Sequence, residues 1–202
     1  MLLIDYILRE KKIDMLEKEI PRQVFHITIG LIIILMLAYL GREITLIIAF
    51  LGSVLGSILI NRKSTGKSLW LFEGVYQKFE RQGGRLPGWG AAWYMIGVLL
   101  IMVFLKNTSS IAACIFIFAI GDGFSTLVGI WGKIKLQYNS KKTLEGTVAF
   151  FLTSIPAYIF INEYAIVLAL VGAIVESLPL DIEDNTLVPV ALVITLYFLG
   201  IA

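Results

Sequence analysis

An acidic residue lies in the middle of an otherwise apolar stretch of this chain. Asp122 stands between Gly121 and Gly123 near the centre of residues 110–131, which are long and hydrophobic enough to form one membrane-spanning helix. A carboxylate at bilayer depth is costly without a partner, so an intramembrane acid indicates a functional site. Glycine lowers helix stability, and we expect the two glycines to weaken the helix where the charge sits. Irregular backbone is tolerated there only where it faces protein or a polar cavity.

The residues that follow Asp122 place further polar groups on one helical face. Thr126, Gly129 and Lys133 come four, seven and eleven residues later, a spacing that keeps them on the same side of a helix. At a rise of ~1.5 Å per residue, Asp122 and Lys133 would lie roughly 16 Å apart along the axis. The spacing predicts a face that runs from a buried acid to a cation at the membrane surface.

Two lysines and an acid open the next apolar segment. Lys141 and Lys142 precede it, and Glu145 is its first residue. Basic residues before a helix N-terminus suit a phosphate, because the free backbone N–H groups and the helix dipole add to the lysine charge. The alternative is that both lysines are ordinary anchors at the membrane surface. Glu145 favours the phosphate site, because an acid is a poor anchor.

Further acids lie towards the C-terminal end of the chain. Glu176 interrupts an apolar segment, and residues 181–185 follow with three acids and no Lys or Arg. An acidic turn beside basic loops suits Mg²⁺, whose preferred ligands are hard oxygens. The alternative is a solvated turn in which Asp184 or Asn185 caps the last helix.

Three more residues are candidates for contact with a phosphate or a proton. His26, the only histidine, follows Arg22 early in the first apolar segment. It either assists a proton or a phosphate, or it is a hydrogen-bonded residue between helices. Arg85 lies in a Gly-rich basic turn that could reach a phosphate, after aromatic and charged residues at 70–79 that predict an interfacial helix.

The elements that must position these groups are membrane helices. The chain has 202 residues, 58% of them hydrophobic and 16% charged, with a mean hydropathy of +0.86. A soluble domain of this size would be less apolar and more charged. We therefore expect an all-α, polytopic membrane bundle that forms one domain over residues 1–202, with an N-terminal amphipathic helix at 1–20 that lies on the membrane or in solvent. Seven apolar segments are expected to span the membrane: 24–40, 44–60, 89–105, 109–131, 145–161, 165–180 and 186–202.

Basic residues are distributed unevenly between the two sides that these segments create. Of 17 Lys and Arg residues, 15 fall within 1–23, 61–88 and 132–144, and only Arg42 and Lys106 lie on the other side. Because cytosolic loops carry the excess of basic residues, we expect the N-terminus in the cytosol and the C-terminus outside. A multi-pass protein of the plasma membrane of a microbe is expected, without a nucleic-acid partner and with the oligomeric state open.

The polar groups converge on the cytosolic ends of the expected helices. Acids that suit a metal, lysines that suit phosphates and an apolar setting indicate one site for a cytosolic nucleotide and a membrane lipid. Phosphoryl transfer depends on positioning, a metal and cations more than on a covalent nucleophile. No Ser/His/Asp or Cys/His set is available for acyl chemistry, and no internal repeat supports an inverted-repeat transporter.

Four segments, in order along residues 20–200, resemble those of the polyprenol kinase family, which includes dolichol kinase, phytol kinase and CTP-dependent diacylglycerol kinase. The Asp122 segment through Gly132-Lys133 is similar to "GD…AS…G…GK", and Lys142 to Gly146 is similar to "K-[ST]-x-E-G". The other two are the "E…DN…P" ending, in Glu176, Asp184, Asn185 and Pro189, and the "R/K…H…G" start, in Arg22, His26 and Gly30.

The resemblance implies a kinase that uses CTP and Mg²⁺ to phosphorylate a membrane lipid alcohol of the polyprenol, dolichol or diacylglycerol (glycerol diether) type. By position, Asp122 and Glu176 would be catalytic or bind the metal together with Asp184, and His26 is a third catalytic candidate. The residues expected to bind the nucleotide are Arg22, Arg85, Thr126, Lys133, Lys141, Lys142, Thr143, Glu145, Gly146 and Asn185. Two alternatives remain at this point, a cytidylyltransferase that makes a CDP-lipid and a cation-coupled transporter.

Overall fold

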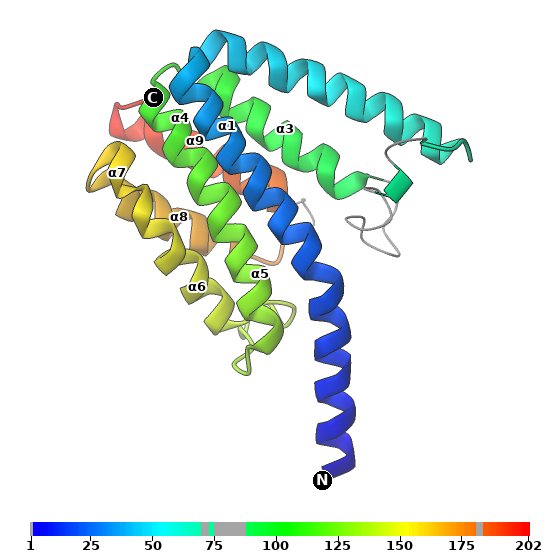
Figure 1. Ribbon diagram of the computed structural model, residues 1–202. Coiled ribbons are helices and arrows are strands. Elements are labelled where there is room, and N and C mark those ends of the chain that lie inside the picture. The colour runs from blue at the N-terminus through cyan, green and yellow to red at the C-terminus, as the bar shows by residue number, and fades with distance from the viewer. Residues whose placement is uncertain (1, 70–72, 75–87, 181–183) are drawn as a thin grey trace.

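The computed structural model describes residues 2–69, 73–74, 88–180 and 184–202, which form a helical bundle (Figure 1). Arg85 and most of the predicted interfacial helix lie outside these residues. One antiparallel β-bridge, between Lys135 and Thr143, interrupts the helical pattern. The elements are α1 (Leu2–Ser64), α3 (Trp89–Phe104), α4 (Thr108–Phe116), the π-helical η2 (Ile117–Gly121), α5 (Asp122–Trp131), α6 (Leu144–Ser154), the 3₁₀ turn η3 (Ile155–Ala157), α7 (Tyr158–Ile161), α8 (Tyr164–Ser177) and α9 (Asp184–Leu199).

The first two apolar segments lie in α1, on either side of a sharp bend. Gly41 has φ 75° and ψ 172°, a backbone conformation that glycine adopts without steric cost. After the bend the chain runs along α3 in the opposite direction, from Arg42 at the end of α3 to Ile60 at its start (Figure 1). The N-terminal segment differs from the separate helix predicted over 1–20, since α1 continues from Leu2 through Pro21 into the apolar segment and extends beyond the bundle. Its many Leu, Lys and Glu residues favour such continuity.

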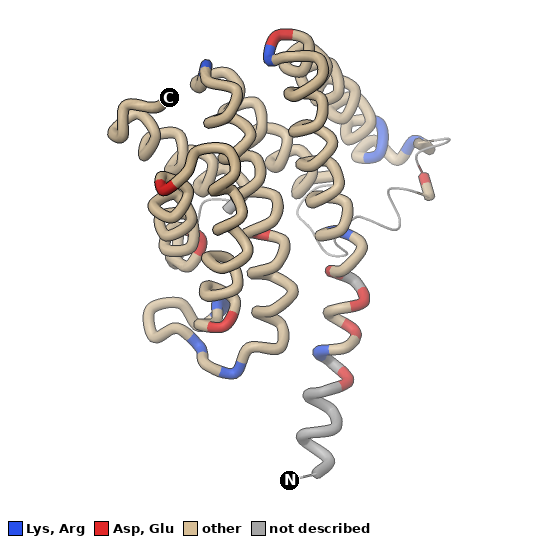
Figure 2. The backbone as a smooth tube through the Cα atoms, turned by 60° about the vertical axis from the view of Figure 1, so that its left-hand side comes forward, with Lys and Arg blue, Asp and Glu red and all other residues tan. Residues whose placement is uncertain are grey.

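Three helical stretches of the described chain are long and apolar enough to cross a membrane. They are Lys12–Ser64, Thr108–Trp131 and Leu144–Ile161, whereas α3, α8 and α9 are apolar but shorter. Each predicted apolar segment is mostly helical. The seven-span topology itself stays a prediction. Charged residues are sparse along the middle of the bundle and gather at its ends and along the N-terminal part of α1 (Figure 2).

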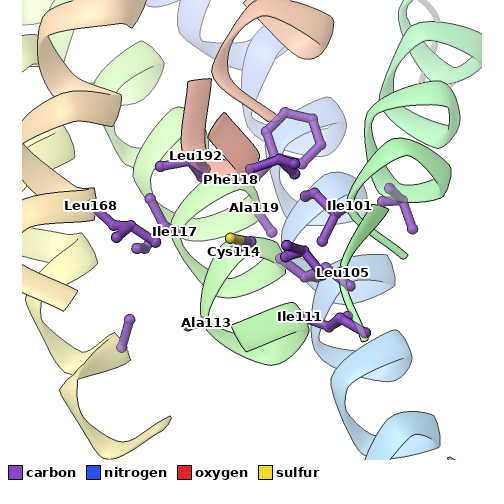
Figure 3. Close-up of a cluster of buried hydrophobic side chains, with 14 of the residues drawn as sticks. Ile101, Leu105, Ile111, Ala113, Cys114, Ile117, Phe118, Ala119, Leu168 and Leu192 are labelled. Atoms are coloured by element: carbon purple, nitrogen blue, oxygen red, sulfur yellow. The ribbon is translucent and has the colours of Figure 1, made fainter. Parts of the chain in front are cut away.

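The centre of the bundle is formed by α4 and η2, which contact α1, α3, α6, α8 and α9. Cys114, Ile117 and Phe118 are fully or almost fully buried there. Figure 3 shows Leu168 of α8 on one side of this helix and Ile101 of α3 on the other. Since α5 follows η2 directly, the central position of α4 and η2 also brings Asp122 into the bundle interior.

The helix around Asp122 is widened rather than broken. Residues Ile117–Gly121 form a π-helical turn, and Asp122 is the first residue of the α-helical stretch after it. Such π-turns inside α-helices occur frequently at functional sites. A β-carbon at Gly121 would lie 2.6 Å from Ser154 Oγ and 2.9 Å from the Phe150 ring, so glycine permits the close approach of α6 at this turn. The expected weakening of the helix therefore takes the form of a π-turn packed against α6.

Candidate functional site

A buried carboxylate at the end of α8 joins three parts of the chain. Glu176 is 2% exposed, and its Oε1 accepts a hydrogen bond from Ser125 Oγ of α5 at 2.9 Å. The same oxygen forms an ion pair with Lys142 Nζ, from the loop before α6. A buried charge left without a partner is strongly destabilising, and this pair offsets that cost. Two predicted site residues, Lys142 and Glu176, are thus brought into direct contact.

Asp122 lies one helical turn from this contact. Ser125 Oγ is 3.2 Å from the Asp122 carbonyl oxygen, and the two residues share a face of α5 because they are three apart. Asp122 is 8% exposed, and the Tyr94 ring stacks on Phe118, about one helical turn before Asp122, which places both residues in the same part of the bundle. Ser125 was not singled out from the sequence. Its position three residues after the buried acid was the available signal.

The loop between α5 and α6 is fixed by Glu145. The carboxylate accepts hydrogen bonds from the backbone N–H of Lys133 at 2.7 Å and of Ile134 at 3.2 Å. Lys133 does not continue the polar face of α5 as predicted, because the helix ends at Trp131 and Gly132 is extended, with ψ 143°. Gly132 packs so closely on Thr143 that a β-carbon there would collide with the threonine side chain.

The far half of this loop is attached to the end of α8. Asn139, which is buried, donates from Nδ2 to the Ser177 carbonyl oxygen at 3.0 Å. The Tyr138 hydroxyl lies 2.8 Å from Ser177 Oγ. These contacts hold Lys142 against Glu176, the residue before Ser177. Asn139 and Tyr138 were missed by sequence reasoning, since a polar loop residue carries no mark of its tertiary partner.

Thr143 and Gly146 set the start of α6 and its distance from α5. Thr143 is the N-cap residue, whose Oγ1 accepts from the Gly146 N–H at 3.2 Å. A β-carbon at Gly146 would lie 2.9 Å from the Ser125 carbonyl oxygen and 3.2 Å from Gly129 Cα. The described contacts of these two residues are therefore capping and close helix packing, beside the lysine that pairs with Glu176.

Arg22 and His26 lie on α1, which packs against α3 and α5. Arg22 forms an ion pair with Glu19 at 2.7 Å. The His26 ring is 3% exposed and lies 4.4 Å from the Tyr94 ring, and its backbone oxygen accepts from the Tyr94 hydroxyl at 3.0 Å. In the described structure His26 Nδ1 has no hydrogen-bond partner. The interpretation of His26 as a hydrogen-bonded residue between helices thus fits its backbone but not this ring nitrogen.

Of the predicted acidic turn at 181–185, the structure describes only Asp184 and Asn185. Asn185 is buried and donates from Nδ2 to the Gly90 carbonyl oxygen at 3.3 Å, so it joins the start of α9 to α3. Asp184 begins α9, but its side chain is outside the described part of the structure. Among the described residues, no three His, Cys, Asp or Glu side chains gather closely enough to hold a metal ion. A magnesium site formed by Asp122, Glu176 and Asp184 together stays a prediction.

The remaining predicted residues lie at the edge of this region. Lys133 and Lys141 are exposed on the loop between α5 and α6, and Thr126 is partly buried on α5. Lys12 Nζ of α1 lies 3.5 Å from the Trp131 carbonyl oxygen, at the end of α5. Lys12, Lys133 and Lys141 therefore bring positive charge to the end of α5 and the loop that follows it, whereas Asp122 and Glu176 are buried.

Comparison with known proteins shows to which family the chain belongs. The chain is 30% identical over 175 residues to an uncharacterized protein of Methanocaldococcus jannaschii, covering 85% of this chain and 89% of that protein. It is 28% identical to a probable chloroplastic phytol kinase of Glycine max and 27% identical to the chloroplastic farnesol kinase of Arabidopsis thaliana, over 88% and 84% of its own length. The chain belongs to the family of the phytol and farnesol kinases. Neither a protein-family model nor a solved structure matches it.

Membership in the phytol and farnesol kinase family confirms the resemblance based on the four motif segments. The chain spans 62% of the length of each of the two plant kinases. In this family member, two segments that are distant in sequence meet at Lys142 and Glu176, and the Asp122 segment joins them through Ser125.

Proposed function

We propose that this protein transfers the γ-phosphate of CTP to the hydroxyl group of an isoprenoid lipid alcohol. The observation that carries the proposal is the buried contact of Lys142, Glu176 and Ser125, one helical turn from Asp122. A cation and two carboxylates within an apolar bundle suit phosphoryl transfer, in which positioning and charge stabilisation do most of the work. The plant relatives named as phytol and farnesol kinases support a lipid alcohol as the acceptor.

The proposed reaction forms one bond to phosphorus and breaks another. The alcohol oxygen attacks the γ-phosphorus and forms the new O–P bond, while the bond from that phosphorus to the β-phosphate oxygen breaks. The alcohol proton leaves to a carboxylate, for which Asp122 is our candidate because it is buried in the interior that a lipid hydroxyl would reach. The products are CDP and a lipid monophosphate.

Lys142 is the proposed partner of the nucleotide phosphates. It is partly buried in its ion pair with Glu176, at the N-terminal end of α6. A helix N-terminus and a lysine together favour bound phosphate. Lys133 and Lys141, exposed on the same loop, would add positive charge at its surface. Arg22, on the neighbouring α1, is a further candidate that would first have to leave Glu19.

Magnesium is the metal that the family resemblance implies, and the residues present fit it. Mg²⁺ usually takes one or two protein carboxylates together with substrate phosphates, so a group of three protein acids is not required. Glu176 and Asp184 would supply carboxylate oxygens, and Asp122 would do so only in place of its role as proton acceptor. When bound, the metal would neutralise charge on the transferred phosphate.

The proposed location is the cytosolic leaflet of the plasma membrane. The loop that carries Lys133, Lys141 and Lys142 is one of the basic connections expected to face the cytosol, where CTP is available. The lipid would approach from the bilayer side of the same bundle.

The deciding experiment supplies purified protein in lipid nanodiscs with Mg²⁺, farnesol, phytol or diacylglycerol, and CTP labelled at the γ-phosphate. We expect label in a prenol phosphate, weaker transfer from ATP, and CDP as the second product. Release of pyrophosphate with formation of a CDP-lipid from a lipid phosphate would establish a cytidylyltransferase instead. Label in diacylglycerol alone would change the acceptor class and leave the kinase hypothesis intact.

A further inference from the structure

Two buried polar side chains on α1 have hydrogen-bonding groups that nothing in the described structure satisfies. Gln23 is fully buried, and neither its Nε2 nor its Oε1 has a hydrogen-bond partner. His26 Nδ1 also lacks one within this part of the chain. A buried polar group without a partner costs about 1–3 kcal/mol, so its presence in an apolar bundle needs an explanation.

These groups lie close to the segment of α5 that begins with Asp122. A β-carbon at Gly123, the residue after Asp122, would be 3.8 Å from Gln23 Oε1, so the amide lies against the backbone of α5 at this point. His26 is three residues after Gln23 and therefore on the same face of α1. Contact with the Tyr94 ring fixes the imidazole, and Tyr94 also stacks on Phe118, about one helical turn before Asp122.

The side chains around Gln23 and His26 suit a neutral ligand. Gln23 has a donor and an acceptor but no charge. Arg22, the residue before Gln23, is already paired with Glu19, and the Lys142–Glu176 pair contacts α5 at Ser125 rather than at Gly123. A phosphate would need cations at close range, whereas a hydroxyl group needs only one or two hydrogen bonds. The side chains that flank the contact of α1 and α5 are apolar and exposed, which suits a hydrocarbon chain: Ile20 and Val24 on α1, and Phe124 and Val128 on α5.

We propose that Gln23 and His26 hold the hydroxyl group of the lipid alcohol next to Asp122. The Gln23 amide N–H donates to the alcohol oxygen, and His26 Nδ1 makes a second hydrogen bond. The alcohol O–H then points to the Asp122 carboxylate, and the hydrocarbon chain lies along the apolar surface of α1 and α5. This assignment rests on the proposed function for the identity of the ligand and adds where the ligand binds.

The test uses Gln23→Met, which keeps the size and shape of the side chain but removes both hydrogen-bonding groups. We expect the KM for farnesol to rise about tenfold, while the KM for CTP stays the same. A tenfold change corresponds to ~1.4 kcal/mol, the scale of one net hydrogen bond. Thermal stability should be equal or higher, because a buried amide without a partner has been removed. A purely structural role of Gln23 would move stability without separating the two KM values.

Ser154→Ala is the matched control. Ser154 is also fully buried, its Oγ also lacks a partner among the described residues, and it lies on α6 against Gly121. Loss of this hydroxyl should leave both KM values unchanged. An unchanged farnesol KM in folded Gln23→Met, or an equal rise in Ser154→Ala, would overturn the assignment.

A binding measurement separates this assignment from the kinase proposal. Wild-type protein and Gln23→Met in nanodiscs are photolabelled with a diazirine analogue of farnesol, without nucleotide. Weaker labelling of the variant supports the hydroxyl site, even if the wild-type protein transfers no phosphate and the proposed function fails. Equal labelling of the two proteins overturns the site, even if phosphate transfer is observed.

Discussion

At the scale of single residues, the site depends on charges that are buried in pairs. Lys142 and Glu176 were expected from the sequence, because acids and lysines stand out in apolar segments. Ser125, Asn139 and Gln23 were not. Serine and amide side chains are common in loops and helices, and only the packing of α1, α5 and α8 gives them their neighbours.

Asp122 provides the first prediction at this scale. In Asp122→Asn the side chain keeps its size but loses its charge and most of its basicity. We expect turnover to fall by at least about 100-fold, the usual range for a lost acid–base group. Phosphate transfer measured on membrane-inserted, monodisperse protein checks this, and full activity would remove Asp122 from the mechanism.

The ion pair provides the second prediction. Lys142→Met leaves Glu176 buried without its cation, and breaking such a pair destabilises by about 3 kcal/mol. Replacing both partners, in Lys142→Met/Glu176→Met, should restore most of the stability but none of the activity, since an apolar pair tolerates the interior. Thermal unfolding of the double variant and the two single variants in one detergent gives the coupling energy between the two sites. If the stability losses of the two single variants simply add up in the double variant, the two residues are not energetically coupled, which would contradict the pair.

At the scale of elements, the apolar segments predicted the helices well, because in lipid a helix satisfies every backbone hydrogen bond within itself. The end of α5 at Trp131 agrees with the predicted span 109–131. The polar face from Asp122 was nevertheless extended to Lys133, two residues beyond this end, whereas the chain turns at Gly132. Gly132 packs against Thr143, twelve residues after Trp131, and no local pattern reveals this contact.

The contact between α5 and α6 leads to the third prediction. In Gly146→Ala, the new methyl group meets backbone atoms of Ser125 and Gly129, which cannot rotate away as a flexible side chain would. We expect α6 to move outward, a loss of on the order of 1–3 kcal/mol as in other overpacked sites, and weaker binding of CTP.

Gly52→Ala is the control for that variant. Gly52 also lies within a helix, but a methyl group added to it would meet no atom within 4 Å. Alanine is favoured over glycine there by roughly 0.5–1 kcal/mol. Equal effects of the two changes on melting temperature would contradict close packing at Gly146.

At the scale of the whole molecule, composition and charge distribution carry different information. Fold class followed from composition, since 58% hydrophobic residues leave few alternatives to membrane helices. The bend at Gly41 did not, because a glycine between two apolar segments fits either a loop or a kink. The expected orientation in the membrane depends on the distribution of Lys and Arg alone.

The fourth prediction tests this orientation with single cysteines. In a Cys114→Ala background, Ser140→Cys lies on the basic loop and Glu163→Cys at the turn between α7 and α8, both exposed. A membrane-impermeant maleimide should label position 163 in intact cells and position 140 only in inverted vesicles. The reverse pattern would place the Lys142 loop outside and separate it from cytosolic CTP.

The ion pair between Lys142 and Glu176 also affects how well the membrane around the protein holds back protons. An unpaired charge inside a helical bundle attracts water molecules. A chain of hydrogen-bonded water molecules lets protons cross a bilayer. Because these two charges cancel each other between turnovers, we expect the resting protein to leave the membrane electrically tight. Liposomes that contain Glu176→Gln, in which the lysine has lost its counter-charge, should then lose a pH gradient faster than liposomes with the wild-type protein.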